Sequence, residues 1–145
     1  MAPEITAATP ADLPAVLELI DASGLPRAGL DNHVATTLVA RESSRIVGTA
    51  ALELYGGSAL LRSVAVAAAV RGQGLGQRLT TAALELASRH GVRTVYLLTE
   101  TAGEFFPKLG FTMIERSAVD PAVQVSQEFT TACPASALVM ARSLT

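Results

Sequence analysis

The residues of this sequence that are best suited to chemistry form a glycine-rich segment in mid-chain, between an apolar stretch and an amphipathic one. The segment consists of Arg71, Gly72, Gln73, Gly74, Leu75 and Gly76. Glycines let a backbone approach a ligand closely, and N–H groups that converge at the positive end of a helix favour an anion. The sequence therefore predicts an anion site here, and a diphosphate suits it well. A tight connection that binds nothing is the alternative for the turn taken alone.

Two familiar phosphate-binding motifs do not match this segment. A dinucleotide fingerprint needs a glycine at position 77, where Gln77 stands, and it normally follows the first strand of a parallel βαβ unit. A phosphate loop would continue with Gly-Lys-Ser or Gly-Lys-Thr, which is absent here. The turn instead follows a predicted hairpin in the middle of the chain.

Polar residues on the predicted hairpin are the next candidates for chemistry. Glu53, near the end of one strand, is the candidate base, with Tyr55 beside it; a solvated carboxylate is the alternative. Arg62 interrupts an apolar strand, and we expect it to share a face with Val64. A guanidinium there would suit a substrate carboxylate or oxyacid. A salt bridge from Arg62 to Glu53 across the hairpin is the equal alternative.

Hydrophobic periodicity predicts the elements of the first half of the chain. Residues 4–9 form a short strand, and a helix with one apolar stripe follows and ends near Gly24. Its start lies at Pro10 or Asp12, because a capping-box pattern favours the first and Pro14 the second. Residues 24–32 are a loop or an irregular helix, and a strand begins at His33. Residues 46–55 and 59–66 form a hairpin with two glycines in its turn.

The second half reads as βα units. A helix follows the glycine-rich turn and ends at Gly91, and residues 94–98 form a buried strand. A capping-box pattern at Thr101 and Glu104 opens a short helix that holds Phe105 and Phe106. Residues 111–115 and 137–141 are the last strands. The pattern predicts a mixed α/β fold in a single domain, residues 1–145.

Composition narrows the class of protein. The chain has 145 residues with a formal net charge of -2, which provides no cluster of cations for nucleic acid. Cys133 is the only cysteine, so a multi-thiolate metal site is excluded and a reducing cytoplasm is expected. The beginning of the sequence lacks the pattern of a signal peptide, and no apolar run is long enough to cross a membrane. We expect a soluble protein without a metal, a membrane partner or a nucleic-acid partner.

Two segments resemble a known family. Residues 61–66, Leu-Arg-Ser-Val-Ala-Val, followed by Arg71-x-x-Gly74-x-Gly76, resemble the coenzyme A motif of the GNAT N-acetyltransferases. Residues 109–111, Leu-Gly-Phe, resemble that family's closing signature, and the likeness extends over nearly the whole chain. It implies a GNAT-like fold, a mixed and mostly antiparallel sheet flanked by helices, and an acyltransferase that uses acetyl-CoA.

The resemblance also implies where acetyl-CoA binds. Its diphosphate would rest on the amides of residues 71–76, and its pantetheine arm would lie beside Val64 and Val66. N–H groups near these valines would stabilise an oxyanion if the strand separates from its neighbour there; core packing is the alternative for their side chains. Phe106 stands where many members have a tyrosine acid, and Thr99 where an asparagine contacts the cofactor. We expect both to line the cofactor site.

A narrower resemblance, carried by residues 97–106 and 133–137, is to ArsN-type arsenic-resistance acetyltransferases and, more distantly, to the acetyltransferase domain of N-acetylglutamate synthase. It implies direct attack by the amine of a small, anionic molecule, such as an amino acid or an amino-acid-like arsenical or toxin. His33 and Arg27 would lie in the loop over the substrate, with a plain surface position as the alternative. Cys133 would meet an arsenical or be a small buried hydrophobe.

Two other functions stay open. A coenzyme A-binding module without catalysis is compatible with Phe106 in place of the tyrosine. A protein or peptide acetyltransferase is the second alternative. The sequence does not determine the oligomeric state, and a homodimer is kept as a hypothesis.

Overall fold

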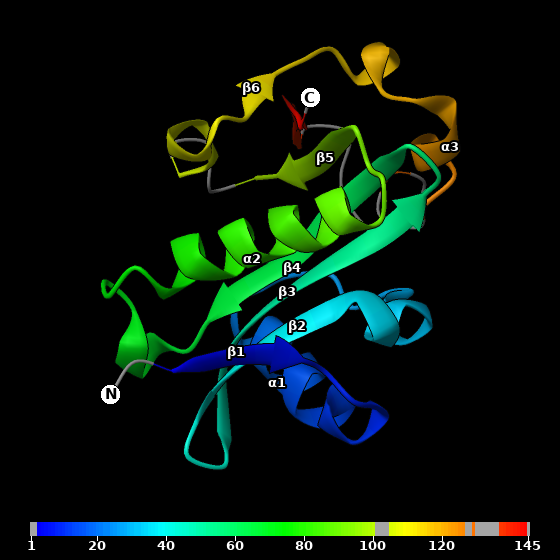
Figure 1. Cartoon of the computed structure of the whole chain (residues 1–145). Helices are drawn as coiled ribbons and strands as arrows, with labels where there is room; N and C mark the ends of the chain where they lie inside the picture. Colours follow the sequence, from blue (N-terminus) through cyan, green and yellow to red (C-terminus); the bar gives the residue numbers. More distant parts are fainter. Residues whose placement is uncertain (1–2, 101–104, 127–128, 130–136, 145) are drawn as a thin grey trace.

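A twisted sheet of seven strands forms the centre of the structure (Figure 1). The structure is a computed structural model, and it describes residues 3–100, 105–126, 129 and 137–144. The strand order is β1-β2-β3-β4-β5-β7-β6. Every neighbouring pair is antiparallel except β4 and β5, which are parallel. The α/β class and the mixed, mostly antiparallel sheet are therefore as the sequence predicts.

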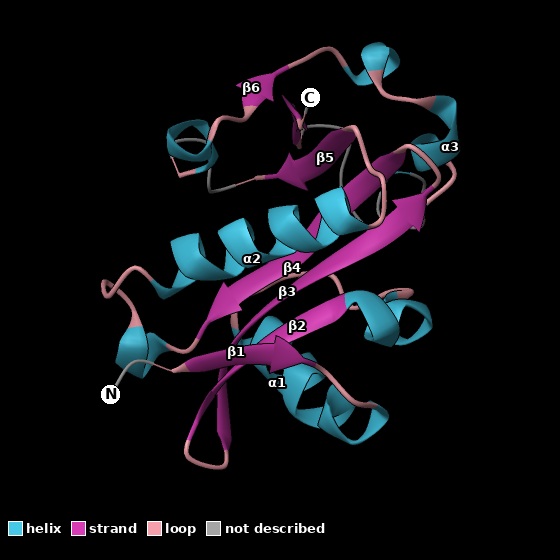
Figure 2. Cartoon of the chain, in the orientation of Figure 1, coloured by secondary structure: helices cyan, strands magenta, loops and turns pink. Residues whose placement is uncertain are grey.

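The elements alternate along the chain as Figure 2 shows. The strands are β1 (Glu4–Ala7), β2 (Thr37–Glu42), β3 (Arg45–Tyr55), β4 (Ser58–Val66), β5 (Thr94–Thr99), β6 (Thr112–Met113) and β7 (Leu138–Ser143). The α-helices are α1 (Leu13–Ala22), α2 (Leu75–Arg89) and α3 (Pro121–Gln124). Short 3-10 helices are η1 (Pro10–Asp12), η2 (Leu30–Thr36), η3 (Ala68–Val70), η4 (Phe106–Leu109) and η5 (Arg116–Ala118).

Helices α1 and α2 cover opposite faces of the sheet (Figure 1). Along a strand, successive side chains point to opposite faces. In β2, Leu38 and Ala40 accordingly pack in the cluster that includes α2, whereas Val39 between them packs with Val16 and Ile20 of α1. The two apolar clusters hold α1 and α2 on either side of β3 and β4, which carry five of the candidate residues.

Helix α2 lies close to β3 because Gly48 has no side chain at the crossing. A Cβ atom built on Gly48 would lie 2.7 Å from Leu79 Cδ1 and 3.2 Å from Leu75 Cδ2. Leu79 and Leu75 are both buried in the core, so they have little space into which to move. The position of α2 on the sheet, and with it the position of the glycine-rich turn, depends on this close approach at Gly48.

Gly48→Val is therefore expected to lower the free energy of unfolding by about 1–3 kcal/mol, the usual cost of inserting extra methylene groups into a packed core. Chemical denaturation of the two proteins measures the difference. Gly57→Val is the matched control, because a Cβ atom at Gly57 meets nothing within 4 Å. Equal stabilities of the two variants would contradict this account of the helix position.

The start of α1 combines the two predicted positions. Residues Pro10–Asp12 form the 3-10 turn η1, and the α-helix follows from Leu13. The Thr9 N–H donates to Asp12 Oδ2 at 2.8 Å, as a capping box requires. Arg41 of β2 donates to the same carboxylate, with Nη1 to Oδ1 at 3.1 Å. The helix is thus tied to the sheet at its first turn.

Asp12 makes the free energy of unfolding depend on pH in the acidic range. The hydrogen bond from Arg41, the main cause, and the bond from the Thr9 N–H lower the pKa of Asp12 from 3.8 to about 2. A depressed pKa in the folded state stabilises the fold fully above the unfolded pKa, and this contribution is lost as the pH falls through the folded pKa. We expect the free energy of unfolding to decline between pH 4 and pH 2 by a component that Asp12→Asn lacks. Denaturation across this window measures it, and Arg41→Met should remove most of the same component.

Three expectations are corrected by the structure. The strand predicted from His33 begins at Thr37, because residues 30–36 form η2 and the His33 carbonyl accepts a hydrogen bond from Thr37 Oγ1 at 2.8 Å. The predicted strand 111–115 is reduced to β6, and the element at Phe106 is the 3-10 helix η4, in which Pro107 occupies the first turn. The capping box expected at residues 101 and 104, like Cys133, falls outside the described residues.

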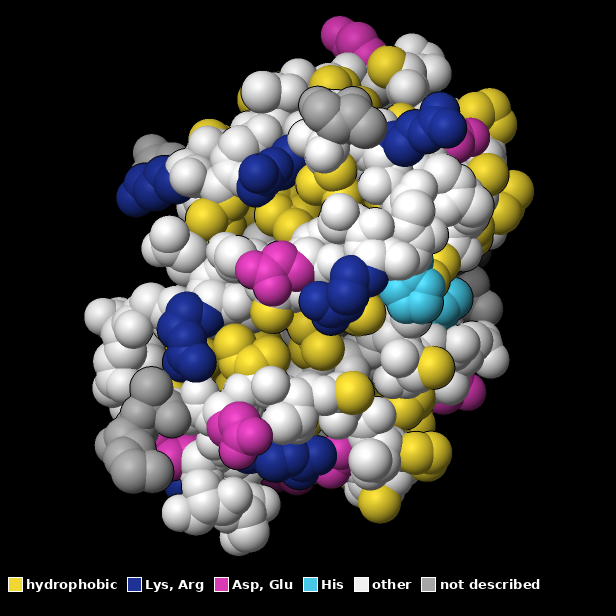
Figure 3. All heavy atoms as spheres, in the orientation of Figure 1, with side chains coloured by type: hydrophobic (Ala, Val, Ile, Leu, Met, Phe, Trp, Pro, Cys, Tyr) yellow, Lys and Arg dark blue, Asp and Glu magenta, His cyan; other side chains and the backbone are white. Residues whose placement is uncertain are grey.

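Charges of both signs are interspersed over the face seen in Figure 3, with apolar side chains between them. No stretch of one sign covers that face among the described residues. None of the helices in the described part of the chain combines the length and apolar character that a membrane span needs.

Candidate active site

The two parallel strands of the sheet separate partway along their length. Strands β4 and β5 pair only from Ser58 with Thr94 to Leu60 with Tyr96. Beyond this point β4 continues to Val66 and β5 to Thr99 without pairing to each other. The separated strands leave an opening in the sheet, and α2 begins at one end of it (Figure 1).

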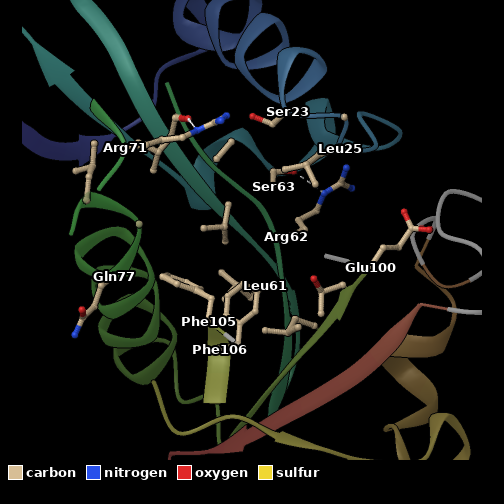
Figure 4. A pocket seen from close by; sticks show the side chains of 18 of the residues that line it. Ser23, Leu25, Leu61, Arg62, Ser63, Arg71, Gln77, Glu100, Phe105 and Phe106 are labelled. Atoms are coloured by element: carbon tan, nitrogen blue, oxygen red, sulfur yellow. Dashed lines mark hydrogen bonds between the residues drawn. The ribbon is translucent and has the colours of Figure 1, made fainter. Parts of the chain in front are cut away.

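A cavity of about 680 Å³ occupies this opening. Its lining combines the second half of β4, the end of β5, the glycine-rich turn with the start of α2, and residues 23–26 after α1. Figure 4 shows Arg71 and Gln77 at the end of the turn, with Arg62 and Glu100 at the other side and Phe105 and Phe106 along the wall. Ten of the sequence-predicted site residues line it: Arg62, Val64, Val66, Arg71, Gly72, Gly74, Leu75, Gly76, Thr99 and Phe106.

The glycine-rich turn presents backbone rather than side chains to the cavity. Gly72 and Gly74 have φ values of 82° and 79°, a region that glycine occupies without steric cost. A Cβ atom on either glycine would meet nothing within 4 Å, so the space before the turn is open. Gly74 caps α2, whose first turn carries no acidic residue. The first N–H groups of a helix lack carbonyl partners within it, and the turn therefore suits a diphosphate.

Gln73 is the exception within the turn. It does not line the main cavity but a shallower hollow beside Ile5 and the outer side of α2. Its side chain is exposed, in keeping with a residue that contributes backbone geometry to the turn.

Aromatic residues form the wall of the cavity that faces α2. Phe106 is buried in the core cluster and meets Phe105 edge to face, with ring centroids 5.0 Å apart, and Phe111 at 5.7 Å. A Cβ atom on Gly76 would lie 3.4 Å from the Phe105 ring, so the start of α2 and this wall are in contact. Phe106 both packs in the core and lines the cavity, and it supplies no proton.

The backbone groups at the open edge of β4 have no partner on β5. Ala67 donates its N–H to the Val47 carbonyl of β3 at 2.8 Å. Alternate residues of an antiparallel strand direct their N–H and C=O groups to opposite sides. Val66 and, two residues earlier, Val64 therefore present their N–H groups to the opening. The Val66 carbonyl on this side accepts a hydrogen bond from Arg71 Nε at 3.0 Å.

A β-bulge changes the side on which β4 side chains lie. Between the pairs Thr49 with Ala65 and Ala51 with Arg62, β3 advances two residues and β4 three. Ser63, within this interval, has a φ of 57°. Val64 packs with the α2 cluster, whereas Arg62 contacts the segment after α1. The prediction that Arg62 and Val64 share a face is therefore wrong, because one extra residue reverses the alternation.

Arg62 forms the salt bridge that the sequence left as the alternative to substrate binding. Its Nη1 lies 2.8 Å from Glu53 Oε2, and the two side chains are 0% and 2% exposed. The guanidinium also donates to the Ala28 carbonyl at 2.7 Å and to the Pro26 carbonyl at 3.0 Å. Arg62 thereby ties β3, β4 and the segment after α1 together.

The other candidates on this side gather around Glu53 rather than in the cavity. Tyr55 donates its hydroxyl to Glu53 Oε1, and His33 Nε2 lies 3.6 Å from the same oxygen. None of these three residues lines the cavity. Arg27 is on the surface, where Nε lies 3.6 Å from Asp21 Oδ1. The base role predicted for Glu53 stays a prediction.

Sequence reasoning missed Ser63, the loop at residues 23–26 and Glu100 as cavity residues. Glu100 directly follows β5 and is exposed. A polar residue at the end of a buried strand was the available signal for Glu100. No local pattern marks Ser63 or the loop, since the bulge and the path of the chain after α1 bring them to the cavity.

Comparisons with known proteins point to one family. A family model described as the acetyltransferase (GNAT) domain matches residues 33–113, more than half of the chain. An uncharacterised N-acetyltransferase of Chlorobaculum tepidum is 33% identical over 85 residues, which are 58% of this chain and 54% of that protein. This chain thus spans about half the length of that relative.

Two solved structures share the fold. N-acetylglutamate synthase from Neisseria gonorrhoeae, complexed with coenzyme A and N-acetyl-glutamate, matches with a TM-score of 0.84 and 20% identity over 98% of this chain and 35% of its own. A Mycobacterium tuberculosis protein in complex with coenzyme A matches with a TM-score of 0.84 and 24% identity over 99% of this chain and all of its own. With the match of the family model, they lead to one conclusion: this chain belongs to the GNAT family of acetyltransferases.

Proposed function

We propose that this protein transfers an acetyl group from acetyl-CoA to the amine of a small molecule. The observation that carries the proposal is the continuity of the glycine-rich turn with the opening between β4 and β5. A diphosphate on the turn, near Gly74, would leave the pantetheine arm to follow β4 past Val66 into the opening. Arg71 and the positive end of α2 add attraction for the phosphates.

The reaction needs few groups from the protein. The neutral amine nitrogen attacks the thioester carbonyl carbon, and the new C–N bond forms. The C–S bond breaks with its electron pair going to sulfur, and the nitrogen loses a proton to water. The N–H groups of Val64 and Val66, on the open side of β4, would stabilise the oxyanion. The departing thiol has a pKa near that of cysteine, about 8.5, so water can protonate the thiolate where Phe106 replaces a tyrosine.

The acceptor is proposed to be small and anionic, such as an amino acid or an amino-acid-like arsenical or toxin. Two observations support this proposal. Arg62 and Ser63 line the cavity, and the fold is similar to that of N-acetylglutamate synthase. The arsenic-resistance role rests on the sequence resemblance alone. A cytoplasmic setting is proposed because the chain has one cysteine.

Calorimetry and a turnover assay test the proposal. Acetyl-CoA and free CoA should both give binding heat with the folded protein, and CoA release should follow the addition of amino acids. Binding without turnover on any amine would favour the non-catalytic module, which the Phe106 wall allows. Turnover confined to peptides would favour a protein acetyltransferase, and no binding of either cofactor form would overturn all three.

A further inference from the structure

The hydroxyl of Ser63 has a hydrogen that no described residue accepts. Ser63 is 6% exposed and lines the cavity. Arg62 Nε donates to Ser63 Oγ at 3.1 Å. A guanidinium only donates, so this bond occupies a lone pair of the hydroxyl and leaves its O–H hydrogen. Within the described part of the chain that hydrogen has no acceptor. The direction that remains for this hydrogen is the cavity, which Ser63 lines. Figure 4 shows the Ser63 side chain beside Arg62.

The backbone of Ser63 is the second observation. Its φ of 57° lies in the left-handed region, which disfavours residues with a Cβ atom. Ser43 is the other non-glycine residue with a positive φ in the described chain, and it sits in the β2–β3 turn. Glycine would adopt the bulge geometry at position 63 without strain. Strained residues cluster at binding and catalytic sites, and here a serine with a free O–H stands where glycine would suit the backbone.

The surroundings define what this donor would take. Arg62 lies behind Ser63, and its charge polarises the hydroxyl toward donation. The Glu53 carboxylate neutralises much of the Arg62 charge, with Glu53 Oε2 2.8 Å from Arg62 Nη1. An anion in the cavity would therefore be bound by the Ser63 hydroxyl rather than directly by the guanidinium. Oxygen or nitrogen could accept this hydrogen, and a carboxylate oxygen makes the strongest bond with an O–H.

We propose that Ser63 is a substrate-binding residue whose O–H donates to a carboxylate oxygen of the acceptor amine, with Arg62 as the positioning residue that sets the orientation of the hydroxyl. The inference rests on the proposed function, which it deepens by assigning the group that recognises the acceptor. Ser63 directly precedes Val64, so an acceptor held there lies beside the N–H groups at the open edge of β4. Amines that carry a carboxylate are thereby preferred.

Matched pairs of acceptors test this assignment. The probes are alanine with ethylamine and phenylalanine with phenethylamine, since each amine lacks only the carboxylate. Wild type should prefer the amino acid of each pair. In Ser63→Ala and Ser63→Gly, kcat/KM for the amino acid should fall about ten-fold or more, mainly through KM, because a hydrogen bond to a charged group is lost. The loss should be much smaller for the paired amine, which has no carboxylate to bind, and the Kd for acetyl-CoA reports separately on the cofactor site.

The two variants separate the hydroxyl from the bulge. Alanine keeps the strained φ and glycine relieves it, yet both remove the O–H. Ser63→Gly removes the backbone strain that Ser63→Ala retains, so the two variants perturb stability by different routes and the test does not depend on the alanine variant alone. Loss of preference in both variants supports the proposal. Wild-type preference in Ser63→Gly, or an equal loss for both members of each pair, would overturn it.

Calorimetry measures the binding of the same amino acids and amines to the CoA-loaded protein, so the role of Ser63 in binding is tested independently of turnover. If wild type acetylates no amine but binds the amino acids in a Ser63-dependent way, the proposed function falls and the Ser63 assignment stands. If wild type turns over these amines without any preference for the carboxylate, the function stands and the Ser63 assignment falls.

Discussion

Acetyl-CoA is expected to bind about 100-fold more weakly to Gly74→Val than to the wild-type protein. The φ of 79° at Gly74 is costly for a residue with a Cβ atom, by about 1–2 kcal/mol, and more for a branched one. A shifted turn would also lose hydrogen bonds to the diphosphate, each worth about 1.5–3 kcal/mol. About 3 kcal/mol in total corresponds to a factor of roughly 100 in Kd. Isothermal titration with acetyl-CoA measures it.

Gly56→Val is the matched control for this prediction. Gly56 has a φ of 68° in the β3–β4 hairpin and, like Gly74, nothing within 4 Å of a built Cβ atom. It lies outside the cavity lining. The control should lose stability from the same backbone strain while its Kd for acetyl-CoA stays at the wild-type value. Unchanged affinity in Gly74→Val would remove the glycine-rich turn from the proposed cofactor site.

Arg62→Leu is expected to lower the free energy of unfolding by about 3–5 kcal/mol, because it leaves the buried Glu53 carboxylate without its guanidinium. The Pro26 and Ala28 carbonyls would lose their donor as well. Replacing both members of a buried pair by apolar residues is often far less costly. The double variant Glu53→Leu with Arg62→Leu should therefore be more stable than Arg62→Leu alone. Denaturant unfolding of the three proteins measures both differences.

An exposed ion pair of the same chain provides the comparison. Arg27 and Asp21 lie 3.6 Å apart with side chains 55% and 50% exposed. Exposed pairs contribute about 0–1 kcal/mol, so Arg27→Ala should change the stability little. If Arg62→Leu were no less stable than Arg27→Ala, the buried pair could not be what holds β3, β4 and the segment after α1 together.

These two predictions concern different parts of one cavity, and they differ in how far the sequence foresaw them. The turn at Gly74 was identified from adjacent residues and confirmed in its geometry, because turn and helix start are set by local backbone preferences. The prediction that Arg62 and Val64 share a face was wrong. A bulge of one residue at Ser63 reverses the face of every side chain beyond it, and apolar alternation alone does not reveal it.

The strand expected from His33 illustrates the same limit. Apolar residues there suited a strand, yet Gly29 with a φ of 78° turns the chain into η2. Side chains distant in sequence then hold it: Thr36 Oγ1 donates to the Leu52 carbonyl at 2.5 Å. His33 is thereby brought to Glu53 instead of to the cavity.

By itself the sequence determined the α/β class, the hairpin of β3 and β4, the start and end of α2 and the glycine-rich turn before it. Those features depend on residues that are neighbours in the chain. Only the tertiary structure decided that β4 and β5 separate after Leu60, that Arg62 is buried against Glu53, and that Ser63 faces the cavity. The reason is that strand pairing, burial and the alternation of faces depend on contacts between segments distant in the chain, which local periodicity does not encode.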